Sequence, residues 1–143
     1  MKKQIPCVIA IAGSDSSGGA GVQADMKTFA ALGVYGTCAL TAITAQNTLG
    51  VSVIYPLTRE VVTSQIVSVL EDIPVEFAKV GMVFSQEVIE GIAELIDKYK
   101  LKFVLDPVFR AGSGDSLIKE DAKKTLTTKL VPRTEVLTPN IIE

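Results

Sequence analysis

Short, almost wholly apolar runs alternate with segments of helical periodicity, and this alternation limits the possible folds more than any other feature. The apolar runs predict strands at Val8–Ala12, Val34–Thr44, Val51–Tyr55, Phe77–Val80, Phe103–Leu105 and Val136–Leu137. Apolar residues at helical spacing predict helices at Ala20–Leu32, Thr58–Leu70, Ser85–Tyr99 and Lys119–Leu130. Such apolar strands are typical of a mostly parallel sheet buried on both faces. We therefore expect an α/β fold with helices on both faces of the sheet.

The composition excludes several classes of function. The chain has 143 residues, enough for one domain or for part of one. Its 14 basic residues are scattered and the net charge is −2, which argues against a nucleic-acid-binding surface. No apolar run approaches the ~18 residues of a membrane span, and the N-terminus lacks the apolar core of a signal peptide. We expect no membrane partner and a cytoplasmic location.

The side chains available for chemistry are limited as well. The sequence has no histidine, which excludes Ser-His and Cys-His catalysis. Its two cysteines, Cys7 and Cys38, lie in apolar runs. They are expected to be buried thiols rather than a disulfide framework or a metal site.

The segment between the first predicted strand and the first predicted helix is rich in glycine. It contains Gly13, Gly18, Gly19 and Gly21. A strand, a glycine loop and a helix in this order let a ligand approach bare backbone at a helix N-terminus. Residues 19–24 fit the dinucleotide pattern G-x-G-x-x-A, but the acidic residue expected about 20 positions later is absent between Asp25 and Glu60. A Walker loop is excluded because no Lys-Ser or Lys-Thr pair follows the glycines. A tight turn without a ligand is the structural alternative, but four glycines exceed what one turn needs.

Polar or glycine-rich clusters directly follow the predicted strands. They are residues 13–21, 46–48, 81–82, 106–107 and 138–140. In open α/β sheets, ligands bind outside the carboxyl ends of the strands. We therefore expect all five clusters to lie along one rim of the sheet and to form a small-molecule site. Residues 111–115 are expected to form a mobile loop beside it.

Four polar residues near this rim are candidates for ligand contacts, and each has a structural alternative. Asp25 lies about 60° from Val22 on a helical wheel, so its carboxylate is either exposed or directed at a ligand. Gln46 lies in a polar loop, or its amide donates to and accepts from a heteroaromatic ring such as an aminopyrimidine. Asp106 begins an Asp-Pro turn or lies near Mg²⁺ and phosphate. Glu143 is solvated or supports a metal through water.

Six motifs, taken in order, resemble those of the hydroxymethylpyrimidine/phosphomethylpyrimidine kinases of thiamine biosynthesis. They are AGSDSSGGAGVQAD at 12–25, TAQNT at 44–48, KVGM at 79–82, LDPV at 105–108, SGD at 113–115 and LTPN at 137–140. The resemblance covers the whole chain and implies a ribokinase-like α/β fold. It implies transfer of the γ-phosphoryl group of ATP to the hydroxymethyl group of a pyrimidine, and then to the resulting monophosphate.

The resemblance also implies roles for individual residues. Asp25 and Gln46 are expected to bind the pyrimidine ring through their side chains. Gly13 and Thr44 are expected to supply backbone to its pocket, and Met82 and Val108 to form its apolar walls. Asp106 and Glu143 are expected to lie toward Mg²⁺ and the phosphates of ATP. The family's glycine-rich anion hole and its catalytic base belong to its second half, which this chain does not match.

We therefore expect residues 1–143 to be the N-terminal part of a single kinase domain, truncated relative to the family and catalytically incomplete on their own. They would then expose a sheet edge that the second half covers. The resemblance also implies a homodimer.

Two alternatives stay open at this point. A pyridoxal or pyridoxine kinase of the same fold would also phosphorylate a hydroxymethyl group, although Gln46 favours the aminopyrimidine. A pyrimidine-binding module without catalysis is the alternative from another class. A dinucleotide-dependent dehydrogenase is disfavoured by the stretch without acidic residues after Asp25.

Overall fold

The computed structural model describes residues 5–110, 112, 114, 116–141 and 143. Ala111, Ser113 and Asp115 belong to the expected mobile loop and lie outside the described residues. The described part of the chain contains no helix that is long and apolar enough to cross a membrane.

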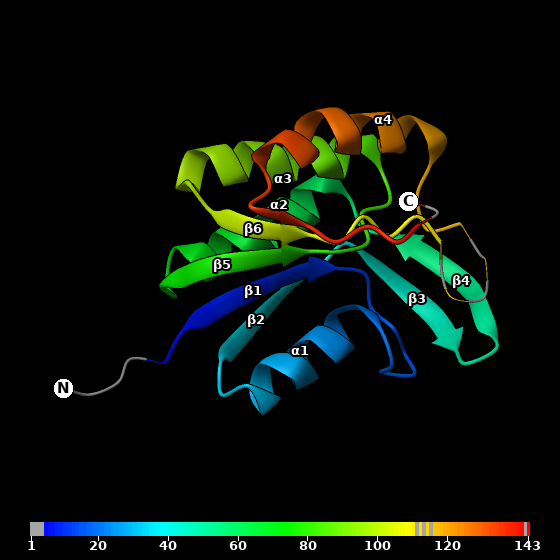
Figure 1. Ribbon diagram of the computed structural model, residues 1–143, viewed down its shortest axis with the longest axis horizontal. Helices are drawn as coiled ribbons and strands as arrows, with labels where there is room; N and C mark the ends of the chain where they lie inside the picture. The colour runs from blue at the N-terminus through cyan, green and yellow to red at the C-terminus, as the bar shows by residue number, and fades with distance from the viewer. Residues whose placement is uncertain (1–4, 111, 113, 115, 142) are drawn as a thin grey trace.

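The described residues form a parallel sheet of five strands and a separate antiparallel hairpin (Figure 1). The strand order of the sheet is β2-β1-β5-β6-β7, and each neighbouring pair is parallel. Its strands are β1 (Cys7–Ala12), β2 (Tyr35–Leu40), β5 (Val75–Val80), β6 (Lys102–Leu105) and β7 (Val136–Leu137). Because all five run in one direction, their carboxyl ends meet at one rim.

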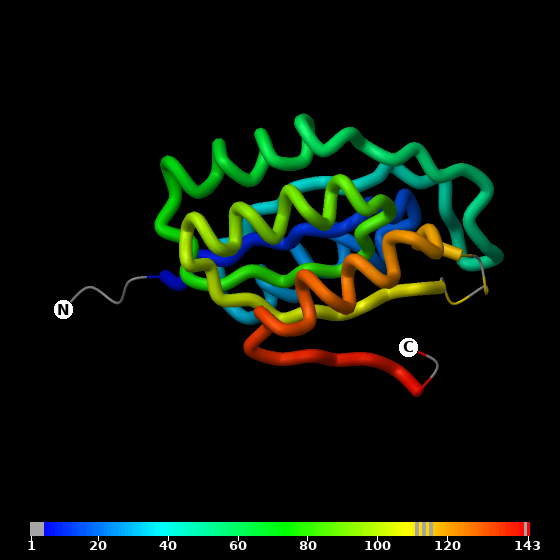
Figure 2. The backbone as a smooth tube through the Cα atoms, turned by 90° about the horizontal axis from the view of Figure 1, so that it is seen from above, coloured from blue at the N-terminus to red at the C-terminus, as the bar shows by residue number. Residues whose placement is uncertain are grey.

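Helices cover both faces of the sheet, which confirms the predicted fold class. The helices are α1 (Gly21–Ala31), α2 (Arg59–Leu70), α3 (Gln86–Tyr99) and α4 (Glu120–Lys129). Figure 1 shows α1 on one face and the other three on the opposite face. Figure 2 shows α2, α3 and α4 side by side, with β7 along the outer edge of the sheet.

The two faces of the sheet bury side chains of different size. The face under α2, α3 and α4 carries the main core, which includes Ile9, Ile11, Ala78, Val80 and Phe103. The opposite face of β1 carries the small side chains of Ala10 and Ala12, which contact Val22 of α1. These alanines let α1 lie close to β1, so the first turn of the helix reaches the carboxyl ends of the strands.

The predicted strand at residues 34–44 is in fact two strands in different sheets. The chain turns at Thr41, whose N–H donates to the carbonyl of Ala12 (3.0 Å) and whose hydroxyl donates to the carbonyl of Met82 (2.7 Å). β3 (Ala42–Asn47) then pairs antiparallel with β4 (Gly50–Pro56). The hairpin extends beyond the carboxyl-end rim of the parallel sheet (Figure 1).

The expectation of two buried thiols is wrong. Cys38 is exposed and Cys7 is only partly buried. Cys38 lies on β2, which forms an edge of the sheet, so strands cover it from one side only. An apolar run therefore does not reveal whether its strand is central or lies at an edge.

Candidate functional site

A pocket of about 310 Å³ lies at the carboxyl-end rim of the sheet. Six of the residues singled out from the sequence line it: Gly13, Asp25, Gln46, Met82, Asp106 and Val108. Lys79, Arg110 and Leu117 also line it. The pocket gathers residues from four of the five predicted clusters, whereas residues 138–140 do not line it. Its volume falls within the range of small-molecule sites, which starts at about 300 Å³.

Two expected site residues do not line the pocket. Thr44 is buried, and its hydroxyl donates to the carbonyl of Ser14 (2.8 Å). Glu143 accepts hydrogen bonds from the N–H groups of Phe109 (3.2 Å) and Asn140 (3.0 Å). Thr44 therefore supports the pocket wall, and Glu143 ties the end of the described chain to the segment after β6.

Two serines of the glycine loop fix the position of Gln46. The Ser14 hydroxyl accepts from the N–H of Thr44 (3.0 Å). The Ser16 hydroxyl accepts from the N–H of Gln46 (2.8 Å) and donates to its carbonyl (2.6 Å). Gln46 and Asn47 are the last residues of β3, so the expectation that they follow a strand is wrong. The hairpin, rather than the parallel sheet, brings the Gln46 amide to the rim.

Asp15 organises the glycine loop from inside. Its buried carboxylate accepts from the N–H and hydroxyl groups of Ser17 and from the N–H groups of Gly19 and Ala20, at 2.8–2.9 Å. Burial acts to raise the pKa of Asp15, but the hydrogen bonds from Ser17 and the two backbone groups outweigh it and hold the pKa below its usual value. The ionised carboxylate therefore stabilises the loop.

We expect Asp15→Asn to destabilise the fold by roughly 2–3 kcal/mol, because the NH₂ group of the amide leaves one or two of these N–H donors without an acceptor. The contribution of ionised Asp15 is complete above its unfolded pKa, about 3.9. It is lost as the pH falls through the lower folded pKa. Chemical denaturation at a series of pH values should show the wild-type advantage shrinking only in acid. Asp72→Asn, which changes an exposed carboxyl, is the control. If wild type were more stable than Asp72→Asn by the same amount as it is more stable than Asp15→Asn, this role would be contradicted.

Glycine is required at the junction between the loop and α1. Gly21 has a φ of 57°, and a Cβ there would lie 2.3 Å from the carbonyl oxygen of Gly13. At Gly13 a Cβ would lie 2.7 Å from the sulfur of Met82, so Met82 packs directly on the bare backbone. Both glycines therefore permit close approaches that build the pocket wall.

Gly21→Ala should lower the free energy of unfolding by about 3 kcal/mol or more, because backbone strain and a backbone clash add together. Gly33→Ala is the matched control, since Gly33 has a φ of 70° and no atom within 4 Å of its would-be Cβ. It should cost only about 1 kcal/mol for the left-handed backbone. Urea titration of both variants measures the difference, and equal losses would refute the clash at Gly21.

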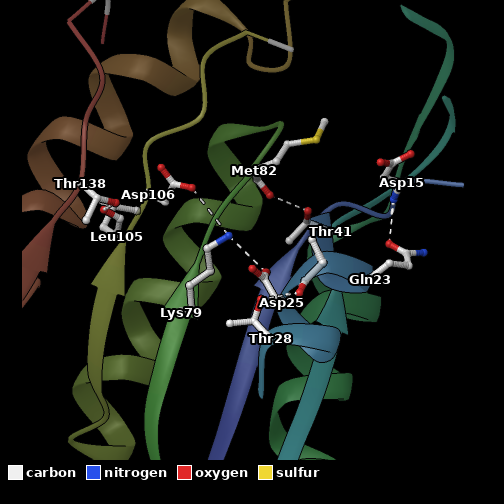
Figure 3. A network of polar contacts seen from close by, with 11 residues as sticks. Asp15, Gln23, Asp25, Thr28, Thr41, Lys79, Met82, Leu105, Asp106 and Thr138 are labelled. Carbon is white, nitrogen blue, oxygen red and sulfur yellow. Dashed lines mark hydrogen bonds and ion pairs between the residues drawn. The ribbon is translucent and has the colours of Figure 1, made fainter. Parts of the chain in front are cut away.

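A lysine lies between the two carboxylates of the pocket (Figure 3). The Lys79 Nζ atom is 3.1 Å from Oδ2 of Asp25 and 3.8 Å from Oδ2 of Asp106. Asp25 comes from α1, Lys79 from the end of β5, and Asp106 directly follows β6. Three separate elements thus bring opposite charges together at the rim.

The electrostatics around Asp106 fit a divalent cation. Burial raises the pKa of Asp106, Lys79 opposes this shift, and the negative charges of Glu143 and Asp25 add to it. The described residues contain no group of three or more His, Cys, Asp or Glu side chains that could hold a metal. Mg²⁺ is commonly held by one or two carboxylates together with phosphate oxygens and water. Asp106 offers one such carboxylate, whereas both carboxylate oxygens of Glu143 accept backbone hydrogen bonds.

The sequence reasoning missed several residues of the site. Lys79, Ser14, Ser16 and Asp15 were not chosen individually, although all lie in motifs noted above. The signal for Lys79 was its position as the one charged residue of the expected strand Phe77–Val80. No comparable signal marked the serines, because their partners are about 30 residues away in the sequence.

The comparisons with known proteins agree with the geometry. The profile of the family described as phosphomethylpyrimidine kinase matches residues 15–143. The hydroxymethylpyrimidine/phosphomethylpyrimidine kinase of Rhizobium meliloti (strain 1021) is 48% identical over 135 residues, which are 94% of this chain and 51% of that protein. The chain thus spans about half the length of the curated relatives it matches.

Solved structures show the same fold. A crystal structure of phosphomethylpyrimidine kinase from Clostridium difficile 630 is similar, with a TM-score of 0.89, 48% identity, and coverage of 98% of this chain and 61% of that chain. Pyridoxal kinase from Staphylococcus aureus, in complex with AMP-PCP and pyridoxal, has a TM-score of 0.83 and 34% identity. The match covers 97% of this chain and 49% of that one. The ribokinase-like architecture expected from the sequence is therefore confirmed.

Proposed function

The chain belongs to the phosphomethylpyrimidine kinase family, and we propose that it supplies the pyrimidine-binding half of an ATP-dependent kinase. The substrate is 4-amino-5-hydroxymethyl-2-methylpyrimidine, and then its monophosphate, on the route to thiamine. The gathering of Asp25, Gln46, Met82 and Val108 around one pocket carries this proposal. Nothing in this function requires a nucleic acid or a membrane.

The pocket offers a flat heteroaromatic ring both apolar walls and polar partners. Met82 and Val108 supply apolar surface. The Gln46 amide offers a donor and an acceptor, and the Asp25 carboxylate offers acceptors. An aminopyrimidine presents the complementary set, with an amino group beside a ring nitrogen. The hydroxymethyl group would then point toward the Asp106 side of the pocket.

The Asp106 side is suited to the phosphate chemistry. We propose that Asp106 and Glu143 face Mg²⁺ and the phosphates of ATP, where the cation neutralises phosphate charge. Phosphoryl transfer depends mainly on positioning and charge neutralisation, so the chain's own contribution is to hold the acceptor ring in a fixed place. The proposed domain arrangement puts the anion hole and catalytic base in the part of the family that the chain does not match.

Pyridoxal is the second candidate substrate, because a structurally similar relative is a pyridoxal kinase in complex with pyridoxal. Both rings carry a hydroxymethyl group. They differ beside it, where the pyrimidine has an amino group that can pair with an amide such as Gln46. We therefore propose a preference for the aminopyrimidine.

Calorimetric titration of residues 1–143 tests the proposal. The aminopyrimidine should bind, and pyridoxal should bind more weakly. Preferred binding of pyridoxal would favour the second candidate, and binding of neither ring would contradict the proposed function. Weak or absent binding of ATP by the same polypeptide is expected, since only part of the phosphate site is proposed to lie in it.

The cytoplasmic location and the homodimer stay predictions. Sedimentation analysis would test the homodimer.

A further inference from the structure

Lys79 occupies an unusual place for a lysine. It lies on β5, the central strand of the sheet, and its neighbours Ala78 and Val80 are buried in the main core. Side chains alternate between the faces of a strand, so Lys79 projects to the face that carries α1. There its ammonium group lines the pocket. Only 24% of the side chain is exposed.

The space for this ammonium group is built into the fold. A Cβ at Gly81 would lie 2.8 Å from the Nζ atom of Lys79 and 3.1 Å from the Cβ of Ala12. The ammonium group therefore occupies the volume that the missing side chain of Gly81 leaves beside the small Ala12. Packing, rather than a freely chosen surface rotamer, fixes its position.

Lys79 holds one oxygen of Asp25 and leaves the other available. The Nζ atom donates to Oδ2 of Asp25 at 3.1 Å. Among the described residues, Oδ1 of Asp25 has no hydrogen-bond partner, and no other basic side chain pairs with Asp25 or Asp106. An ionised carboxylate can only accept hydrogen bonds. The ligand group that meets Asp25 must then be an N–H or O–H donor.

We propose that Lys79 is a positioning residue that orients Asp25 in the pocket and keeps it an acceptor for a donor group of the pyrimidine. This inference rests on the proposed function. Lys79 makes its contacts through Asp25 and Asp106, so it joins the ring side of the pocket to the phosphate side. Its removal would leave Asp25 free to rotate and without its charge partner. The ring would then lose an oriented acceptor rather than a direct contact with lysine.

A double-mutant cycle on Lys79 and Asp25 tests this role. The ligand is 4-amino-5-hydroxymethyl-2-methylpyrimidine, titrated by calorimetry into wild type, Lys79→Met, Asp25→Asn and the double variant. Each single variant should weaken binding about tenfold or more. The double variant should bind no worse than Asp25→Asn alone, because Lys79 acts through that carboxylate. Thermal melting of each variant shows that it is folded.

Two further variants sharpen the comparison. Lys79→Gln removes the charge but keeps a donor, and it carries the same test if Lys79→Met does not fold. Lys102→Met removes the same charge from the neighbouring strand β6, outside the pocket, and should change affinity less than about twofold.

The outcomes distinguish failure of the role proposed for Lys79 from failure of the proposed function. If folded Lys79→Met or Lys79→Gln binds the pyrimidine as tightly as wild type does, the role of Lys79 is overturned and the proposed function is not. Losses that simply add in the double variant overturn it as well, because they show that Lys79 does not act through Asp25. Absence of wild-type binding overturns the proposed function, and this inference with it.

Discussion

Replacing Gln46 by alanine is expected to weaken binding of the aminopyrimidine about 10- to 100-fold while changing pyridoxal binding far less. The Ser16 hydroxyl bonds both the backbone N–H and the carbonyl of Gln46, so the Gln46 side chain is presented to the pocket from a fixed place. Its loss would leave the amino group and ring nitrogen of the ligand without partners, and unpaired buried polar groups are costly. Calorimetric titration with both ligands measures the ratio.

Gln86→Ala is the matched control for this prediction. Gln86 begins α3, away from the pocket, and its amide donates to Glu90 (2.9 Å). Its replacement should leave both affinities within about twofold. Equal losses for the aminopyrimidine and for pyridoxal in Gln46→Ala would show that Gln46 does not select between the two rings.

The second large effect concerns phosphoryl transfer. A polypeptide of residues 1–143 should bind the pyrimidine without transferring phosphate from ATP above background. Correct positioning of two reactants is worth roughly 7–11 kcal/mol, and the anion hole that holds the donor is proposed to lie in the unmatched half of the family. Fusing residues 1–143 to the half of the Rhizobium meliloti relative that this chain does not match should restore turnover. A coupled assay of ADP release checks both proteins.

Within that fusion, Asp106→Asn should reduce turnover about 100-fold or more, because it removes a carboxylate proposed to face the metal and phosphates. Asp97→Asn is the control, since that carboxyl is exposed and pairs with Arg133 far from the pocket. ADP release above background from residues 1–143 alone, dependent on the pyrimidine, would contradict the incomplete-site account.

The layered architecture was predictable because local pattern and global fold agree in this chain. Thr58 precedes α2 and its hydroxyl accepts from Val61, as the sequence predicts for a helix start. The last four residues of β1 are buried because helices lie on both faces of the sheet, whereas both residues of the edge strand β7 are exposed. The break at Thr41 was not predictable, since it depends on hydrogen bonds to residues that are distant in sequence. Residues 34–44 are rich in β-branched and aromatic residues on both sides of Thr41, so the sequence does not mark the change of sheet.

The site was predictable in outline for a different reason. The strand-end rule brings Gly13, Met82 and Asp106 to one rim without any knowledge of side-chain contacts. Thr44 was expected to supply a backbone group to the pocket, but its N–H donates to the Ser14 hydroxyl, because the hairpin folds back over the glycine loop. Lys79 escaped notice because its role appears only when Gly81 and Asp25 are seen beside it.

The proposed function depends on where the pyrimidine binds. A crystal structure of residues 1–143 with 4-amino-5-hydroxymethyl-2-methylpyrimidine tests this most directly. We expect the ring to lie between Met82 and Val108, with the Gln46 amide facing the amino group and ring nitrogen. A donor group of the ligand should lie on Oδ1 of Asp25. A ring bound elsewhere on the molecule, or bound in this pocket without contacting Gln46 or Asp25, would contradict this expectation.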